Sequence, residues 1–196
     1  MAVKHEITLS DIMAPADYAA KRRELKSEIS AKKRDRRVAI GPDAMFYFES
    51  YDTMWHQVHE MLHIEKGGRE QIPDELAAYN PLIPNGHELV ATVMFEIADP
   101  ARRARVLGEL GGVEQTFSVT VAGEKIAGLP EEDVDRTNAA GKASSVQFVH
   151  FPFSSDQIEA FKSGDGEVIV AVGHANYAHM AVMQSSVRSA LAEDFD

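Results

Sequence analysis

The stretch from Leu89 to Ile97 most constrains the fold, because it is apolar on nearly both faces of a strand. Its odd-numbered residues are all apolar, and two of its even-numbered residues, Val90 and Met94, are apolar as well. A strand of this kind is buried on both sides and belongs in the middle of a sheet. The chain is therefore expected to be built around a sheet with 89–97 as a central strand.

Turn signals and periodicity place other strands and helices around this one. Further strands are predicted at 38–40, 44–49, 117–121, 125–127, 146–151 and 168–172. Helices are predicted at 15–35, 52–66, 73–79, 100–110, 154–161 and in the tail to 195, with a polar loop at 128–144. We expect an α+β fold in one domain, 1–196, with a mainly antiparallel sheet of about five or six strands and flanking helices.

Composition excludes several classes of protein. The chain has no cysteine, so disulfides, thiolate catalysis and Cys-ligated metal sites are absent. It has no run of 18 apolar residues and no secretory signal at its start, which predicts a cytoplasmic protein without membrane association. A regular alternation of strands and helices is missing, and so are the glycine-rich phosphate motifs, so a nucleotide-binding fold is not expected.

The net charge of −11 is spread unevenly along the chain. Residues 21–37 hold nine basic side chains against three acidic ones, about +6 in all. The predicted helix that carries them, about 15–37, forms an N-terminal basic arm. It is interpreted either as a solvated or self-docked helix or as a surface for an acidic partner. Nucleic acid is not expected as a ligand, because the rest of the chain is acidic.

Residues 59–63 read His-Glu-Met-Leu-His, a full H-E-x-x-H match. On a helix, His59 and His63 lie one turn apart on the same face, which is the spacing that a metal ion needs from two imidazoles. Glu60 is a candidate ligand or general base for a metal-bound water. His56, one turn earlier, adds a third imidazole. A helical wheel places these four side chains opposite an apolar arc of Met54, Trp55, Val58, Met61 and Leu62.

The pattern has an incomplete context for a zinc hydrolase. Glu65 stands where zinc proteases have a hydrophobic residue, and Lys66 and Arg69 replace the glycine and third histidine of the metzincin continuation. Glu60 and His63 also form the E-x-x-H half of a ferritin-like di-iron site, but no second half exists. The zinc hydrolase is therefore the lesser alternative.

A second polar cluster follows a predicted buried strand. It contains His174, Asn176, Tyr177 and His179, and His150 lies on another strand. If these segments fold over the helix, their imidazoles join Glu60 in a nitrogen and oxygen set that suits zinc or iron. Alternatively, His56 and His59 are solvated and His150 is a hydrogen-bonded core residue.

The chain resembles an uncharacterised bacterial family that is catalogued as a domain of unknown function. The resemblance covers nearly the whole length and rests on several strings: 40–43 (Ile-Gly-Pro-Asp), 46–55, 60–66, 75–84, 141–148 and 173–177 (Gly-His-Ala-Asn-Tyr). Members of this family tend to be encoded near rubrerythrin-like and iron–sulfur oxidoreductase proteins. The resemblance therefore implies an accessory role in an iron- or peroxide-related redox system, and it implies that residues other than histidine are admissible at position 63.

Two hypotheses follow. In the first, the chain binds a transition metal through His56, His59 and His63, with His174 and His179 as ligands from a second segment, and serves as a redox-associated accessory protein or a metal-dependent enzyme. In the second, it is a metal-free interaction subunit whose basic helix and His-bearing face dock an acidic or redox partner.

Overall fold

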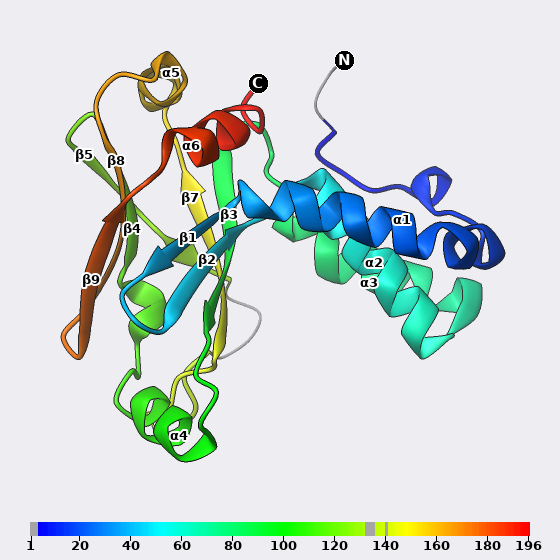
Figure 1. Cartoon of the computed structure of the whole chain (residues 1–196), viewed down its shortest axis with the longest axis horizontal. Helices are drawn as coiled ribbons and strands as arrows, with labels where there is room; N and C mark the ends of the chain where they lie inside the picture. The colour runs from blue at the N-terminus through cyan, green and yellow to red at the C-terminus, as the bar shows by residue number, and fades with distance from the viewer. Residues whose placement is uncertain (1–3, 132–135, 140) are drawn as a thin grey trace.

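The computed structural model describes residues 4–131, 136–139 and 141–196, which form a two-sheet sandwich with a helical arm on one side (Figure 1). Sheet A has the order β1 (Arg37–Ile40), β2 (Ala44–Phe48), β3 (Glu88–Phe95), β7 (Val146–Pro152) and β6 (Leu129–Pro130). Sheet B has the order β5 (Glu124–Ala127), β4 (Phe117–Val121), β8 (Val168–His174) and β9 (Tyr177–Val182). All pairings are antiparallel, so the predicted α+β class is confirmed.

The helices lie at the ends and on one side of this sandwich. The α-helices are α1 (Pro15–Arg34), α2 (Tyr51–Glu65), α3 (Ile72–Tyr79), α4 (Pro100–Gly108), α5 (Ser155–Ser163) and α6 (Ser185–Ala192). Short 3-10 turns lie at Leu9–Asp11, Gly68–Glu70, Asn80–Leu82 and Val113–Gln115. Helices α1, α2 and α3 form the helical arm (Figure 1). Among the described residues, no helix is both long enough and apolar enough to cross a bilayer.

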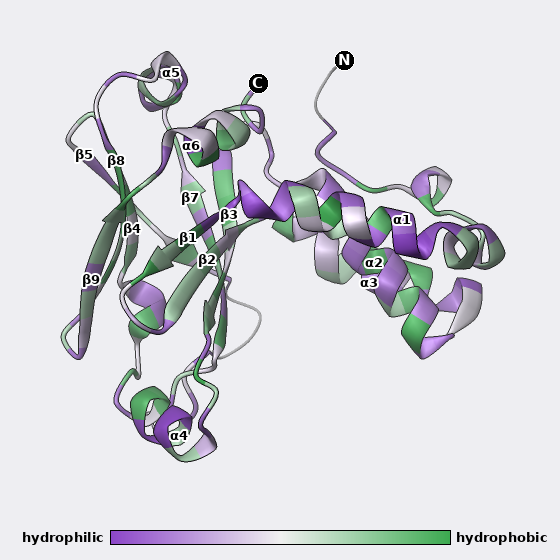
Figure 2. Cartoon of the chain, in the orientation of Figure 1, coloured by the Kyte–Doolittle hydropathy of each residue, from purple (hydrophilic) through white to green (hydrophobic). Residues whose placement is uncertain are grey.

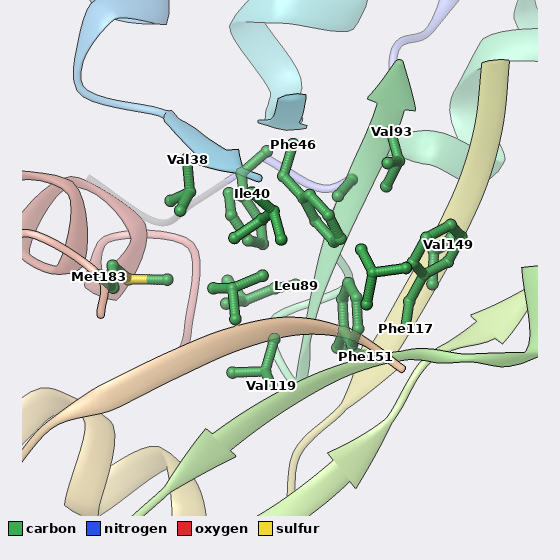
Figure 3. Packing of buried hydrophobic residues seen from close by; sticks show 14 of the residues in the cluster. Val38, Ile40, Phe46, Leu89, Val93, Phe117, Val119, Val149, Phe151 and Met183 are labelled. Atoms are coloured by element: carbon green, nitrogen blue, oxygen red, sulfur yellow. The ribbon is translucent and has the colours of Figure 1, made fainter. Parts of the chain in front are cut away.

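The strand at 88–95 is central, as predicted, and its two apolar faces serve two cores. It pairs with β2 on one side and β7 on the other. Leu89, Ala91 and Val93 face the core between the two sheets. Figure 3 labels Leu89 and Val93 among the residues of this core. Val90 faces the other way and packs in a second cluster with Met54 and other residues of the arm. The arm is therefore attached to the sandwich through an apolar contact on the outer face of sheet A.

The strand arrangement differs from the sequence prediction in two respects. The described residues contain nine strands in two sheets, where we expected five or six in one sheet. Residues 173–179, expected to be a loop, belong to a β8–β9 hairpin, and β9 occupies part of the tail that was predicted helical. Strand β9 is an edge strand that is mostly exposed, so it lacks the apolar alternation from which strands are recognised. The predicted polar loop 128–144 contains β6 and lies partly outside the described residues.

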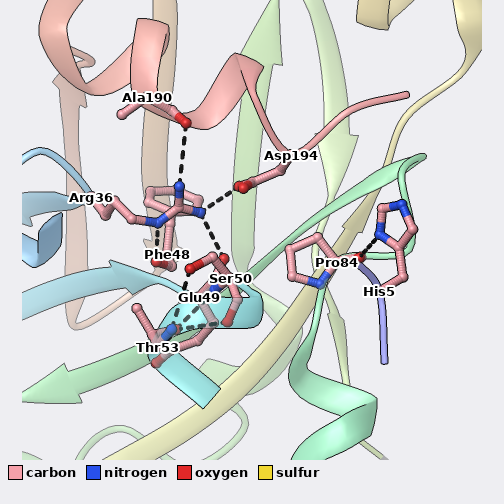
Figure 4. Close-up of polar contacts among 9 residues, drawn as sticks. All are labelled: His5, Arg36, Phe48, Glu49, Ser50, Thr53, Pro84, Ala190 and Asp194. Carbon is pink, nitrogen blue, oxygen red and sulfur yellow. Dashed lines mark hydrogen bonds and ion pairs between the residues drawn. The ribbon is translucent and has the colours of Figure 1, made fainter. Parts of the chain in front are cut away.

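Arg36 fixes the junction between the arm and the sandwich, as Figure 4 shows. Its buried guanidinium donates hydrogen bonds to the carbonyl oxygens of Phe48, Glu49 and Ala190, at 3.0, 2.7 and 3.2 Å. It also forms an ion pair with the carboxylate of Asp194. Burial raises the pKa of Asp194 to about 6, although the positive charge of Arg36 opposes this effect. The end of α1 is thereby tied to β2 and to the C-terminal segment.

Candidate functional site

The predicted His-bearing helix exists as α2, and its polar face is covered by α1. Helix α2 begins at a capping box in which the Ser50 and Thr53 side chains accept each other's backbone N–H groups. The two helices run antiparallel, since Tyr18 of α1 contacts the last turns of α2 while Lys32 pairs with Asp52 at its start. The predicted polar face therefore meets a second layer, and Met54 and Val58 of the predicted apolar arc are buried in the cluster on sheet A. Trp55 departs from the predicted segregation, because its ring also lies against Tyr18 of α1, with 6.5 Å between the ring centroids.

His59 is buried, and both of its ring nitrogens are already hydrogen bonded. Its Nδ1–H donates to the carbonyl oxygen of Trp55 at 2.7 Å, and its Nε2 accepts the backbone N–H of Met13 at 3.0 Å. The ring also lies 4.0 Å from the Trp55 ring centroid. Burial lowers the pKa of His59, so the neutral form fits these contacts. In this arrangement His59 attaches the segment before α1 to α2, and neither nitrogen is available to a metal.

Glu60 forms a polar tie between α1 and α2. Its carboxylate accepts hydrogen bonds from Nε and Nη2 of Arg22, both at 2.8 Å, and from the Tyr18 hydroxyl at 2.7 Å. The hydrogen bonds from Arg22 lower the pKa of Glu60 to about 2. A general base works best when its pKa is close to the working pH. Glu60 therefore suits an interhelical ion pair better than the predicted role in proton transfer.

His56 and His63 lie on the same face of α2 in different surroundings. His56 is buried, and its Nε2 has no hydrogen-bond partner among the described residues. Burial also lowers the pKa of His56. His63 is half-buried, with its ring 6.0 Å from that of Tyr18. Across the described part of the chain, no three His, Cys, Asp or Glu side chains are arranged to hold one metal ion.

The second predicted cluster braces the β8–β9 hairpin. His174 donates from Nε2 to the carbonyl oxygen of Gly111 at 3.2 Å, and its Nδ1 accepts the backbone N–H of Asn176, also at 3.2 Å. The Asn176 side-chain amide donates to the carbonyl oxygen of Glu109 at 2.9 Å. These bonds attach the hairpin to the segment after α4.

Tyr177 and His179 hold the β1–β2 turn. The buried Tyr177 hydroxyl accepts the N–H groups of Asp43 and Ala44, at 2.8 and 2.9 Å, and donates to the carbonyl oxygen of Ile40 at 2.7 Å. The His179 ring lies over Gly41, where an added Cβ would stand 2.6 Å from that ring and where φ is +65°. Only glycine meets both demands. These residues belong to sheet B, so the structure does not bring them to the histidines of α2.

His150 lies on the outer face of sheet A between two carboxylates. Its Nδ1 is 3.0 Å from Glu88 and its Nε2 is 3.8 Å from Glu131. The hydrogen bond that the His150 ring donates to the Glu88 carboxylate is the main reason that the pKa of His150 is raised. His150 is therefore hydrogen bonded, as the alternative expects, but it is half-buried and not a core residue. The same alternative is wrong about His56 and His59, which are buried and not solvated.

Most of the cations of α1 are concentrated on one side of the helix, a feature that the sequence analysis missed. On a helical wheel at about 100° per residue, five of the seven cations of α1 fall within an arc of about 120° on one side of the buried stripe, without an acidic residue among them. The three acidic residues fall on the other side, together with Lys21 and Lys32, within about 80°. The five cations, called the basic arc, are Arg22, Arg23, Lys26, Lys33 and Arg34; the acids are Asp17, Glu24 and Glu28. Figure 2 shows hydrophilic residues along α1. A wheel of residues 15–34 reveals this pattern from the sequence.

An open groove of about 380 Å³ runs between α1 and α2 beside the basic arc. Its walls are Ala19, Arg22, Arg23 and Lys26 from α1 and His63 from α2. Arg22 forms an ion pair with Glu60, whereas Arg23 and Lys26 form no ion pair with other described residues. The groove therefore presents unneutralised cations next to one imidazole, a lining that suits carboxylate or other anionic groups.

Comparisons with known proteins place the chain among proteins without an assigned activity. A crystal structure of a novel protein of unknown function from Burkholderia pseudomallei is similar to it, with 32% sequence identity and a TM-score of 0.90. The alignment covers 97% of this chain and 99% of the other. No curated protein matches the chain. Residues 6–195 match the family described as "Protein of unknown function (DUF3501)", and the chain therefore belongs to that family.

Proposed function

We propose that this protein is an interaction subunit that docks an acidic partner protein along the basic arc of α1. The observation that carries the proposal is the concentration of five cations on the side of α1 beside the groove, on a chain whose net charge is −11. An acidic partner is repelled by most of such a surface and is attracted where cations gather. The basic arc therefore sets both the site and the orientation of docking.

The basic arc is free to bind at little internal cost. Arg23, Lys26, Lys33 and Arg34 form no ion pair with other described residues, so a partner's carboxylates need not displace an existing bond. Arg22 differs, because its pairing with Glu60 keeps the groove wall in place. Arginine contacts to carboxylates are common at interface positions that dominate affinity. Arg23 is thus the residue from which we expect the largest contribution.

The family resemblance suggests which acidic partner to test. Its implied setting is an iron- or peroxide-related redox system, and complexes between redox proteins are small, transient and strongly dependent on charge. A redox protein with an acidic surface is therefore the partner class within this proposal. Metal binding by this chain stays a prediction; the unpartnered Nε2 of buried His56 is the observation that favours it.

A binding experiment with a defined acidic probe tests the proposal. Fluorescence anisotropy with a labelled poly-glutamate peptide is compared for the wild type, an Arg23→Ala/Lys26→Ala double variant and a Lys125→Ala/Lys142→Ala double variant. The control removes the same charge from exposed positions on the sandwich. We expect the groove variant to bind roughly tenfold more weakly, a loss of about 1.4 kcal/mol, with little change in the control.

Two results would overturn docking of an acidic protein. Equal weakening by both double variants would show that binding follows net charge alone. Tighter binding of a single-stranded oligonucleotide of matched charge, lost in the Arg23→Ala/Lys26→Ala variant, would instead identify the basic arc as a nucleic-acid surface.

A further inference from the structure

Strand β9 is the one sheet edge among the described strands that carries no protection against pairing. Exposed edges invite another strand, and proteins block them with short length, charge, proline or bulges. Edge β1 has four residues and begins at Arg37, β5 carries Glu124 and Lys125, and β6 has two residues and ends in Pro130. Three of the four edges therefore use a known device.

Strand β9 uses none of these devices. Its six residues, Tyr-Ala-His-Met-Ala-Val, include neither proline nor a charged side chain, and their register with β8 is unbroken from end to end. Four of the six are exposed, including Met180 at 72% and Val182 at 52%. Within the described residues, the backbone of β9 pairs with β8 alone. Figure 1 shows β9 at the margin of the sandwich away from the helical arm.

The outer face of sheet B beside this edge is also nearly uncharged. Val182, Met180 and Ala178 stand on it, because the alternate residues Tyr177 and Ala181 pack on the core side. The neighbouring outward positions on β8 and β4 are Ile169, Ala171, Gly173, Ser118 and Thr120. Lys125, on the opposite edge strand, is the nearest charged position in these rows. In Figure 2 the ribbon of β9 is mainly pale green.

We propose that β9 pairs with β9 of a second copy of this chain, antiparallel about a two-fold axis. This pairing joins the two copies of sheet B into one continuous sheet of eight strands. An antiparallel edge is complementary to itself, as a two-fold interface requires. The net charge of −11 on each copy opposes association, but β9 carries no Asp, Glu, Lys or Arg, so two copies can pair along this edge without like charges facing each other.

The expected dimer is weak and depends on concentration. A strand of six residues is only about 20 Å long, so the interface lies below the roughly 800 Å² per partner of a standard stable complex. Backbone hydrogen bonds supply most of its specificity, and the apolar row of Ala178, Met180 and Val182 continues across the axis. The helical arm lies on the other side of the sandwich (Figure 1), so dimer formation and docking at the basic arc are separate properties.

Sedimentation velocity over about a hundredfold range of concentration tests the pairing. We expect the wild type to shift from monomer to dimer, and Met180→Lys to stay monomeric because two lysines face each other near the axis. The lysine makes the net charge less negative, so weaker association cannot arise from general repulsion. Ile64→Lys, at a position that is 62% exposed on the arm, is the matched control and should behave as the wild type.

Cysteine trapping identifies the surface directly. Because the chain has no native cysteine, Ala178→Cys, Met180→Cys and Val182→Cys can each be oxidised without competing thiols. At least one should give a disulfide-linked dimer, whereas Ile64→Cys should not. A wild type that remains monomeric throughout, or a dimer that Met180→Lys leaves intact, overturns the proposal; so does preferential trapping at position 64.

Discussion

Replacing Glu60 with glutamine removes the charge that ties α1 to α2. A pKa of about 2 in place of 4.5 corresponds to about 3 kcal/mol of favourable interaction with the ionised carboxylate. The Arg22 side chain keeps 35% of its surface exposed, so solvent screens part of this energy. We expect Glu60→Gln to lower the free energy of unfolding by about 1–2 kcal/mol at neutral pH.

The stability lost in Glu60→Gln should also depend on pH in a defined direction. The folded-state pKa of Glu60 lies below its unfolded value, so the stabilisation is complete above about pH 4.5 and is lost as the pH falls towards 2. Urea unfolding is followed by far-UV circular dichroism and by the fluorescence of Trp55, the single tryptophan. Glu24→Gln, on the exposed face of α1, is the control. Equal stability of Glu60→Gln and the wild type, or a difference that stays constant down to acidic pH, would refute the ion-pair account.

Three other changes test separate parts of the structure. Tyr177→Phe leaves two backbone N–H groups and a carbonyl without their partner, so it should cost about 2–4 kcal/mol in urea unfolding, with Tyr79→Phe as the control for loss of a hydroxyl. His150→Asn should cost more stability below pH 6.5 than in alkaline solution, because the raised folded-state pKa gives a stabilisation that is lost as the pH rises through it; thermal unfolding across this range measures the difference. Metal analysis of protein purified without a His tag should give well under one zinc or iron per chain. The content should not change in a His56→Ala/His59→Ala double variant. A wild-type content near one per chain that is lost in this variant would favour the metal-binding prediction.

Elements whose partners are local could be predicted from the sequence. The strand at 89–97, the helix that starts at the Ser50 cap and the helix that starts at Pro15 all have signals within a few residues of their ends. Strand β9 had no such signal, because its conformation follows from pairing with β8 and its side chains are mostly exposed. The division into two sheets likewise follows from long-range pairings.

The candidate site shows the same limit at the level of single side chains. The sequence places His59 and Glu60 on a polar helix face, and the structure confirms that face. The sequence does not show that α1 lies across this face. There Arg22 and Tyr18 donate hydrogen bonds to the Glu60 carboxylate. The backbone N–H of Met13, just before α1, donates to the His59 imidazole. A pattern of potential ligands and a set of interhelical hydrogen bonds use the same residue types. Only the neighbouring helix distinguishes them.

The contacts of Arg36 have a mechanical consequence for the helical arm. Swinging α1 about its junction with β1 would break three hydrogen bonds to carbonyl oxygens and leave a guanidinium and a carboxylate buried apart. We therefore expect the arm to be held rigidly against the sandwich and not to move about a hinge. A partner that binds the arm meets a preformed surface, so binding costs little conformational entropy of the arm. Differences in affinity among partners should therefore lie mainly in their dissociation rate constants.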